Sequence, residues 1–320
     1  MTAGRLIRRT LRRALPRGER REILLYGRRP TGRDFGREIV GGEAGNRVIR
    51  EQLARGRPTL VTRLGAVELT VLNFFVRWRS RIPWASARPG YPADDLARLQ
   101  TNAGFFPTTD RAADRFAALY LDSLELADVL GVWFLPSEHE RARRCPNARL
   151  VQLESLDPVL HAEPWTAGLA GKRVLVIHPF AASIERQYGE RRRDLFRNPE
   201  TLPEFELQTL KAVQSVAGEI TPFESWFDAL DHMCEEIARR TYDVAIIGAG
   251  AYGLPLGAFV KRQGRQAVHL GGTTQILFGI IGRRWELDDR FRPLVNSAWV
   301  RPSDEERPLG HLAVEDSCYW

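Results

Sequence analysis

Residues 242–285 read YDVAIIGAGAYGLPLGAFVKRQGRQAVHLGGTTQILFGIIGRRW, and this stretch decides the fold class of the chain. It begins with an apolar run that ends at a glycine turn, continues with a helical pattern, and returns through a second short apolar run to Gly271 and Gly272. Parallel strands joined by a helix have this pattern, and phosphate-bearing ligands commonly bind at their glycine-rich ends. The stretch therefore predicts an α/β fold with a ligand site at these turns.

The first apolar run leads into Gly248, Gly250 and Gly253, which have the G-x-G-x-x-G spacing of dinucleotide-binding proteins. Such a site also needs an acidic residue at the end of the next strand, about 20 residues on, to bind the ribose hydroxyls. That strand, predicted at residues 266–270, runs into two glycines with no carboxylate in reach. No NAD is therefore expected. An NAD(P)-dependent oxidoreductase and glycines that merely allow close packing stay open as alternatives.

We predict that both turns bind phosphate. Backbone N–H groups from Gly250 to Tyr252 can point toward an anion at the start of a helix, where the helix dipole assists. The second turn offers two glycines and two hydroxyls that can cap a helix or meet a ligand: Gly271, Gly272, Thr273 and Thr274. Two adjacent strand ends with this chemistry would form one cleft.

Strand-like and helix-like segments alternate along the rest of the chain. Runs of strand length occur at residues 59–64, 129–134, 149–153, 173–177 and 205–213, the last suited to a sheet edge. Helical periodicity occurs at residues 65–78, 109–124, 183–191 and 226–239. This alternation predicts one Rossmann-like α/β domain with a mostly parallel sheet over residues 38–320. We expect a glycine-rich link at residues 41–45, a loop at residues 83–92, and a tail at residues 303–320 that packs back on the domain.

Composition narrows the class of protein. With 320 residues and 43% hydrophobic content the chain can bury a full core. Cys145, Cys234 and Cys318 are far apart and lack C-x-x-C spacing, so neither a zinc site nor a disulfide framework is indicated. No apolar run approaches the roughly 20 residues that span a bilayer, and the N-terminus lacks the apolar segment of a signal peptide. We therefore expect a cytoplasmic protein.

The net charge of +7 is concentrated in a predicted N-terminal arm, residues 1–37. Eleven arginines and two glutamates give residues 1–33 a charge of +9, so the remaining residues sum to −2. Apolar side chains from Leu6 to Leu15 recur at helical spacing among the arginines, as in basic helices that lie on anionic membranes. One interpretation is peripheral contact with the inner face of the membrane, and the other is a solvated arm without a partner. No nucleic acid is expected, because interleaved aromatic residues are missing.

Three segments together resemble a known family. They are residues 248–285, the upstream VLVIHPFAASIERQY at residues 174–188, and the ending NSAWVRP…VEDSCYW. From about residue 58 onward the chain resembles a bacterial family of GT-D fold-like proteins, which are similar to GT-D-type glycosyltransferases. The resemblance implies a Rossmann-like domain, a nucleotide-sugar donor and usually a divalent metal such as Mn²⁺ or Mg²⁺. It implies sugar transfer to a saccharide or lipid-linked acceptor in the synthesis of surface polysaccharide or glycoconjugates. A non-catalytic member that binds a nucleotide or a sugar is the alternative.

One motif departs from this family. In the glycosyltransferases that the chain resembles, a strand ends in a pattern close to R-F-G-D-G-E, whose acidic pair is associated with metal and sugar nucleotide. The matching stretch here holds Arg63, Gly65 and Glu68, but Ala66 replaces the aspartate. Since Mg²⁺ is usually held by one or two carboxylates plus phosphate oxygens, Glu68 would be the only metal ligand from this motif. Arg63 can instead neutralise a diphosphate through bidentate hydrogen bonds, without metal. The alternative is a carboxylate that complements the helix dipole, paired with Arg63.

The resemblance and the strand-end positions together give the candidate site. Glu68 and His178 are the catalytic candidates, with His178 as a sugar or base contact or as the general base of the acceptor. A strand-end histidine can equally be a structural hydrogen-bonding group. The predicted donor-binding residues are Arg63, Gly65, Ser183, Gln187, Gly248, Gly250, Tyr252, Gly253, His269, Gly271, Gly272, Thr273 and Gln275. Surface placement is the alternative for Ser183, Gln187 and Gln275.

Overall fold

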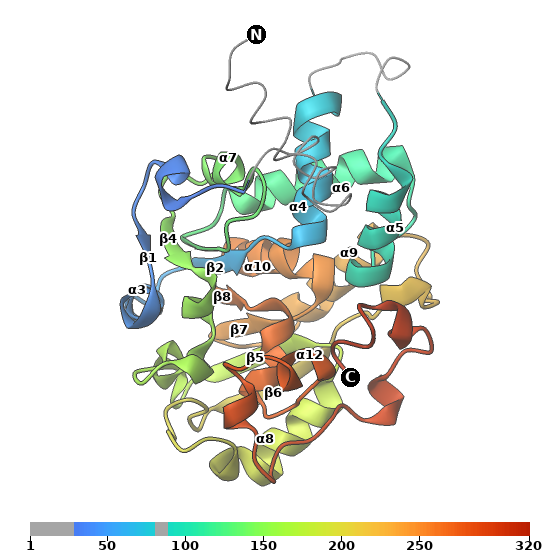
Figure 1. Ribbon diagram of the computed structural model, residues 1–320. Helices are drawn as coiled ribbons and strands as arrows, with labels where there is room; N and C mark the ends of the chain where they lie inside the picture. The colour runs from blue at the N-terminus through green and yellow to red at the C-terminus, as the bar shows by residue number, and fades with distance from the viewer. Residues whose placement is uncertain (1–28, 81–88) are drawn as a thin grey trace.

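A sheet of eight strands lies at the centre of the computed structural model, within the chain that the structure describes, residues 29–80 and 89–320 (Figure 1). The order across the sheet is β1-β4-β3-β2-β8-β7-β5-β6, and every neighbouring pair is parallel. The strands are β1 (Ile39–Val40), β2 (Thr59–Arg63), β3 (Val129–Val132), β4 (Arg149–Gln152), β5 (Arg173–His178), β6 (Glu206–Lys211), β7 (Val244–Ile247) and β8 (Gln266–His269). The predicted Rossmann-like α/β fold is confirmed.

The strands form here because their apolar runs are buried on both faces. Side chains alternate across a strand, so Val244 and Ile246 of β7 pack on one side of the sheet while Ala245 and Ile247 pack on the other. β6 has a weaker pattern with exposed ends, and it is the edge strand that its sequence predicted.

Helices cover both faces of this sheet (Figure 1). One apolar cluster holds α4 (Ala66–Phe74), α5 (Ala93–Ala103), α6 (Asp110–Leu124), α9 (Trp226–Ala238) and α10 (Gly253–Arg262) against the sheet, and the opposite cluster holds α3 (Gly42–Ala54) and α8 (Ala181–Leu195). The shorter helical segments include a π-helical turn (Phe75–Arg79), α7 (Glu138–Ala142), α11 (Thr274–Leu277) and α12 (Arg283–Glu286), and 3-10 turns at Gly250–Tyr252 and Gly271–Thr273. Side-chain caps fix two of the predicted helix starts, since Thr109 and Ser225 accept from the backbone of Ala112 and Asp228.

One sequence-based expectation about the N-terminal half is wrong, and one helix there was missed. The glycine-rich stretch 41–45 is not a link but the start of α3, where Gly45 lets the helix approach Ser155 so closely that a side chain would overlap it. Helix α5 was not predicted at all, because Leu96 and Leu99 are the only large apolar side chains of a mostly polar segment.

The predicted basic arm lies largely outside the described residues, as do residues 83–88 of the predicted loop. The chain already packs against the domain at Phe35, whose side chain is buried. The guanidinium of Arg37 donates to the backbone carbonyls of four residues: Ala142, Cys145, Pro146 and Ala148. No helix within the described ranges is long and apolar enough to cross a membrane.

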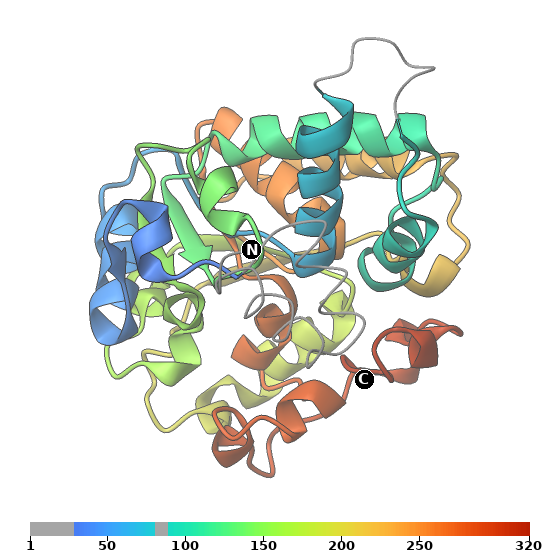
Figure 2. The same ribbon diagram turned by 45° about the horizontal axis from the view of Figure 1, so that its top comes forward.

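The C-terminal segment packs back on the domain, as its sequence predicted. Figure 2 shows this segment, in red, on the side of the molecule that holds α8. The indole of Trp320 donates to the carbonyl of Glu306 at 3.2 Å, and Gln275 donates to the carbonyl of Tyr319 at 3.1 Å. Residues far apart in sequence therefore meet around the end of the chain.

Candidate functional site

A cavity of about 470 Å³ opens at the carboxyl edge of the sheet. Residues at or just after the ends of five strands line it: Arg63 (β2), Trp133 (β3), His178 (β5), Gly248 (β7) and His269 (β8). The neighbouring strands β5 and β7 lead into helices on opposite faces of the sheet, α8 and α10, so the winding direction switches between them. Ligands of doubly wound sheets bind at such a switch point, outside the carboxyl ends of the strands.

Most of the residues that the sequence predicted as site residues line this one cavity. They are Arg63, Gly65, Glu68, His178, Gly248, Gly250, Tyr252, His269, Gly271, Gly272 and Gln275. The two glycine turns are neighbours because β7 and β8 pair side by side, with Ile247 opposite His269. Parallel strands share their carboxyl edge, which explains why strand-end residues from distant parts of the sequence converge.

Four of the predicted residues do not line the cavity. The hydroxyl of Ser183 donates to Glu306 at 2.5 Å, and Gln187 donates to the carbonyl of Ala298 at 2.9 Å, so both buried side chains tie α8 to the C-terminal segment. Gly253 packs directly under the ring of His269, where a side chain would overlap that ring. The Thr273 hydroxyl donates to the carbonyl of Leu270 at 3.4 Å.

The guanidinium of Arg63 is a polar group of the cavity wall that few protein contacts hold. Its guanidinium makes no hydrogen bond and no ion pair with the part of the chain that the structure describes, and its Nε is buried without a partner. The group is held by stacking over the indole of Trp133, with 4.5 Å from Cζ to the ring centre. Its Nη1 lies 2.9 Å from the position that a Cβ on Gly271 would take, so the guanidinium reaches over the β8 turn. This arrangement suits bidentate binding of an anion.

Glu68 lies in the first turn of α4 with 6% of its surface exposed. Burial raises the pKa of this carboxyl, its own backbone N–H and the charge of Arg63 oppose the rise, and Glu315 adds to it. The carboxylate folds back over Gly65 so closely that any side chain at residue 65 would overlap it. The interpretation of Glu68 as a helix N-terminal carboxylate therefore fits, but no ion pair with Arg63 forms in the structure.

The two histidines of the cavity are both buried. Burial lowers the pKa of each ring to about 3, and the charge of Arg63 adds to the effect on His269. His178 accepts the N–H of Phe180 on Nδ1 at 3.0 Å, and Nδ1 of His269 lies 3.0 Å from the hydroxyl of Thr62. Both rings are therefore neutral at physiological pH, with one nitrogen each engaged by the protein.

The glycines of the two turns allow close packing, and they also present backbone N–H groups that a ligand can bind. A Cβ on Gly248 would lie 2.7 Å from Cδ2 of His178 and 2.6 Å from the hydroxyl of Thr274, so this glycine permits close packing. Gly250 and Gly271 have φ of +52° and +70°, which favours glycine on conformational grounds. The N–H groups of Gly250 and Gly272 donate to no other residue within the described ranges. The turns therefore leave donors for a ligand.

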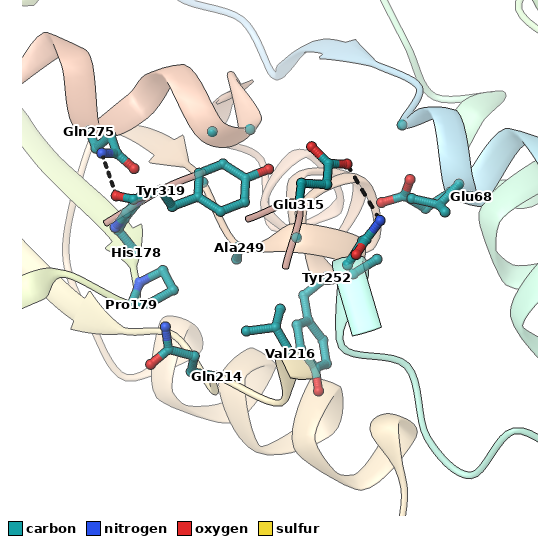
Figure 3. Close-up of a pocket in the computed structure, with 18 of the residues that line it drawn as sticks. Glu68, His178, Pro179, Gln214, Val216, Ala249, Tyr252, Gln275, Glu315 and Tyr319 are labelled. Atoms are coloured by element: carbon teal, nitrogen blue, oxygen red, sulfur yellow. Dashed lines mark hydrogen bonds between the residues drawn. The ribbon is translucent and has the colours of Figure 1, made fainter. Parts of the chain in front are cut away.

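Tyr252 and Gln275 are held mainly by the protein. The Tyr252 ring stacks on Trp226 at 4.9 Å between centres, and its hydroxyl lies 3.1 Å from that of Ser215. Gln275 is fully buried rather than facing solvent; its amide donates to Ile280 and Tyr319, while its Oε1 is buried without a partner (Figure 3).

Sequence reasoning missed several residues of the cavity wall: Asn102, Trp133, Gln214, Arg284, Glu315 and Tyr319. Trp133 directly follows β3, so the strand-end rule would have found it had the strand been predicted to end at Val132. The others arrive through tertiary packing that leaves no local signal. Arg284 pairs with Glu315, which also accepts from Asn102 at 3.4 Å and lies beside Glu68 (Figure 3).

The carboxylates do not fit a resident metal site. The described ranges contain no group of three or more His, Cys, Asp or Glu side chains that could hold an ion. Glu68 and Glu315 are the carboxylates that line the cavity, and Glu315 is already paired with Arg284. Structural and catalytic ions generally require three or more protein ligands, whereas Mg²⁺ delivered with a diphosphate needs one or two carboxylates.

Comparisons with known proteins give little beyond this geometry. No protein-family model matches the chain, and no curated protein matches it. The chain is similar to a solved structure described as a selenomethionine-substituted domain of unknown function, DUF1792. The two share 12% sequence identity over 85% of this chain and 94% of that one, with a TM-score of 0.37.

Proposed function

We propose that this chain is a glycosyltransferase that binds a nucleotide-sugar donor in the cavity at the carboxyl edge of the sheet. The acceptor would be a saccharide or a lipid-linked saccharide in the synthesis of surface polysaccharide or glycoconjugates. The guanidinium of Arg63, which has no hydrogen-bond or ion-pair partner among the described residues and lies beside the β7 and β8 turns, is the observation that carries the proposal. A diphosphate offers the oxygens that such a guanidinium and the open N–H groups of Gly250 and Gly272 can bind together.

The dimensions suit an extended ligand. Three strand spacings separate the backbone ends of β2 and β5, roughly 14 Å, and the Arg63 guanidinium and the His178 ring extend over the β8 and β7 turns between them. The cavity volume of about 470 Å³ lies within the range of small-molecule sites. Trp133 and Tyr319 add aromatic faces on which a base or a sugar ring can stack. One end of the ligand can therefore meet Arg63 while the other end reaches His178.

The proposed reaction uses only side chains that line the cavity. Transfer breaks the bond between the anomeric carbon of the sugar and the diphosphate oxygen, and forms a bond from that carbon to the acceptor oxygen. Arg63 neutralises the negative charge that develops on the departing diphosphate. Glu68 accepts the proton that the acceptor hydroxyl loses, since its carboxylate faces the cavity and makes no hydrogen bond to another described residue.

A binding protein without transferase activity is the second candidate. Ala66 stands where the glycosyltransferases that the sequence resembles have an aspartate, and the motif is left with one carboxylate. A nucleotide or sugar could then be held by Arg63 and the two turns without any turnover. Binding and turnover must therefore be measured separately.

Calorimetric titration tests the proposal. UDP, GDP and their sugars are titrated into the full chain with and without Mn²⁺, with NAD⁺ as a comparison ligand, and donor hydrolysis is then assayed. We expect a nucleoside diphosphate to bind, and Arg63→Gln to weaken it by about tenfold or more. Arg50→Gln, which changes a partly exposed arginine of α3, is the matched control. Unchanged affinity in Arg63→Gln would contradict the phosphate role of Arg63, and binding without turnover would favour the second candidate.

A further inference from the structure

The ring of His178 is held in one orientation by the turn that follows β5. Nδ1 accepts the backbone N–H of Phe180 at 3.0 Å. Pro179, which lies between them, has no N–H, so Phe180 supplies the first backbone donor after the strand. Phe180 is itself fixed, because its side chain is buried and its carbonyl accepts the N–H of Ile184 at the start of α8. The backbone donor beside Nδ1 is therefore a permanent feature of this turn.

This contact determines which ring nitrogen carries the proton. A neutral imidazole has one N–H and one acceptor nitrogen. Because Nδ1 accepts from Phe180, the proton of His178 lies on Nε2. A protonated ring would set an N–H on Nδ1 against the N–H of Phe180. Burial, which lowers the pKa of His178 to about 3, also favours the neutral ring.

The free edge of the ring faces the cavity. His178 has 4% of its surface exposed and lines the cavity wall. No residue of the described ranges accepts a hydrogen bond from its Nε2, although Nδ1 is engaged. Cδ2, the carbon bonded to Nε2, packs against Gly248, where a Cβ would lie 2.7 Å away, so a side chain at residue 248 would displace the ring. Nε2 is not one of the fully buried side-chain atoms that lack a partner, so this N–H is accessible from the cavity and an oxygen of a ligand can accept from it.

We propose that His178 donates its Nε2–H to an oxygen of the sugar of the bound nucleotide-sugar and does not act as a general base. The ligand class rests on the proposed function, whereas the position of the proton does not. With the diphosphate bound at the Arg63 guanidinium, over the β8 turn, the group at His178, beside the β7 turn, is the next one along the ligand, the sugar. A nitrogen that already carries a proton cannot take one from the acceptor hydroxyl, so that task stays with Glu68.

Two-dimensional NMR of the full chain with ¹⁵N-labelled histidine tests the proton position. Long-range ¹H–¹⁵N correlations distinguish a protonated ring nitrogen from an unprotonated one, and the signals missing in His178→Phe assign the residue among the six histidines. We expect the Nε2–H form of His178 throughout pH 5 to 8. A proton on Nδ1, or titration of the ring within that range, would overturn the inference. This result holds whether or not the protein proves to be a glycosyltransferase.

Binding measurements test the ligand oxygen. His178→Phe keeps a ring of similar size without the donor, and we expect it to weaken a nucleotide-sugar by about tenfold while leaving UDP or GDP within twofold. His178→Gln restores an N–H donor and should recover part of the loss. His232→Phe, on the exposed side of α9, is the matched control. Equal weakening of the nucleotide and the nucleotide-sugar would overturn the sugar assignment, as would unchanged binding of both.

Should His178→Phe fail to fold, His178→Gln provides the binding comparison and the NMR measurement on the unmodified chain still decides the proton position. Should the unmodified chain bind none of the tested nucleotides, the proposed function and the sugar assignment fail together. The tautomer of His178 would then be judged by NMR alone. The two failures are therefore distinguishable.

Discussion

At the scale of single residues, the site depends on a series of supports behind Arg63. The Arg63 guanidinium rests on the indole of Trp133, whose Nε1 donates to the carbonyl of Leu64 at 3.1 Å. The backbone N–H groups of Trp133 and Leu135 in turn donate to the buried carboxylate of Glu138, at 3.2 and 3.0 Å. Within the described residues the Arg63 guanidinium has no ion-pair partner, so the Trp133 ring orients it, and Glu138 in turn orients the backbone of Trp133.

Replacement of Glu138 tests this support through its pH dependence. Burial raises the pKa of Glu138 to about 7 from 4.5, so the folded protein binds this proton more tightly than the unfolded chain. Proton binding by Glu138 therefore contributes its full stabilisation of the fold below pH 4.5. This contribution is lost as the pH rises through 7. We expect the unmodified protein to lose on the order of 3 kcal/mol relative to Glu138→Gln between pH 4.5 and 8.

Urea unfolding of both proteins at pH 4.5, 6 and 8 measures this difference. Glu140→Gln changes a more exposed carboxylate on the same short helix and should give parallel curves at all three pH values. If the stability difference between Glu138→Gln and the unmodified protein stays constant with pH, the carboxylate is already ionised in the fold and its pKa is not raised.

Gly65→Ala probes the placement of the Glu68 carboxylate. An added methyl would overlap this carboxylate, which is the movable end of a side chain, so the carboxylate shifts while the backbone stays. We expect turnover to fall roughly 100-fold, as displacements of catalytic groups by about 1 Å do, with a melting temperature within a few degrees of the original. Activity assays with thermal unfolding followed by circular dichroism check both.

Gly168→Ala is the control for that substitution, because no atom lies within 4 Å of its added methyl and its φ is not positive. Full turnover by Gly65→Ala would show that the observed position of the Glu68 carboxylate has no bearing on the chemistry.

At the scale of elements, the C-terminal segment forms one wall of the cavity. Three successive residues, Glu315, Asp316 and Ser317, have φ of 44°, 56° and 63°. Left-handed backbone costs roughly 1–2 kcal/mol at each non-glycine residue, so other contacts must hold this turn. Arg283 donates to the carbonyl of Asp316 at 3.1 Å, and His311 lies 2.7 Å from the hydroxyl of Ser317. The strained turn is what aims Glu315 at the cavity.

Ser183→Ala tests whether this segment belongs to the site. Ser183 binds Glu306 through its hydroxyl and its N–H, and Glu306 is buried, so loss of the hydroxyl leaves a carboxylate with fewer donors. We expect a loss of about 1–3 kcal/mol in unfolding free energy, together with weaker ligand binding. Ser297→Ala, at an exposed position, is the control. A stability loss with unchanged affinity would mean that the segment does not shape the ligand site.

The sequence predicts the strands better than it predicts the residues around their ends. Apolar runs such as residues 244–247 are buried on both faces and have one stable placement, so β5 and β7 end within a residue or two of their predicted limits. Strand-end groups such as Arg63 and His178 follow from the same rule. Asn102 and Glu315 could not be predicted, because a mostly polar helix and an irregular segment carry them to the cavity through packing alone.

At the scale of the whole molecule, charge separates the arm from the domain. Residues 1–33 carry +9 and the remaining chain −2. We propose that the arm binds anionic membrane, and we expect the full chain to float with vesicles that contain anionic lipid, in a manner that high salt weakens. A deletion of residues 1–28 should not float. It preserves Phe35 and Arg37, which already pack on the domain.

Vesicles of neutral lipid are the control for flotation. Equal flotation by the shortened and the full chain would assign any membrane contact to the domain, and the arm would then be a solvated segment. An acceptor anchored in lipid would be reached most readily by an enzyme held at that surface.

The stacking of Arg63 on Trp133 also makes the cavity optically accessible. The chain has eight tryptophans, and Trp133 and Trp320 are those that line the cavity within the described ranges. An anion that draws the guanidinium away from the indole changes the surroundings of that chromophore. Ligand entry should therefore alter the intrinsic fluorescence of the unmodified protein, and Trp133→Phe should remove most of the response, which offers an assay without any label.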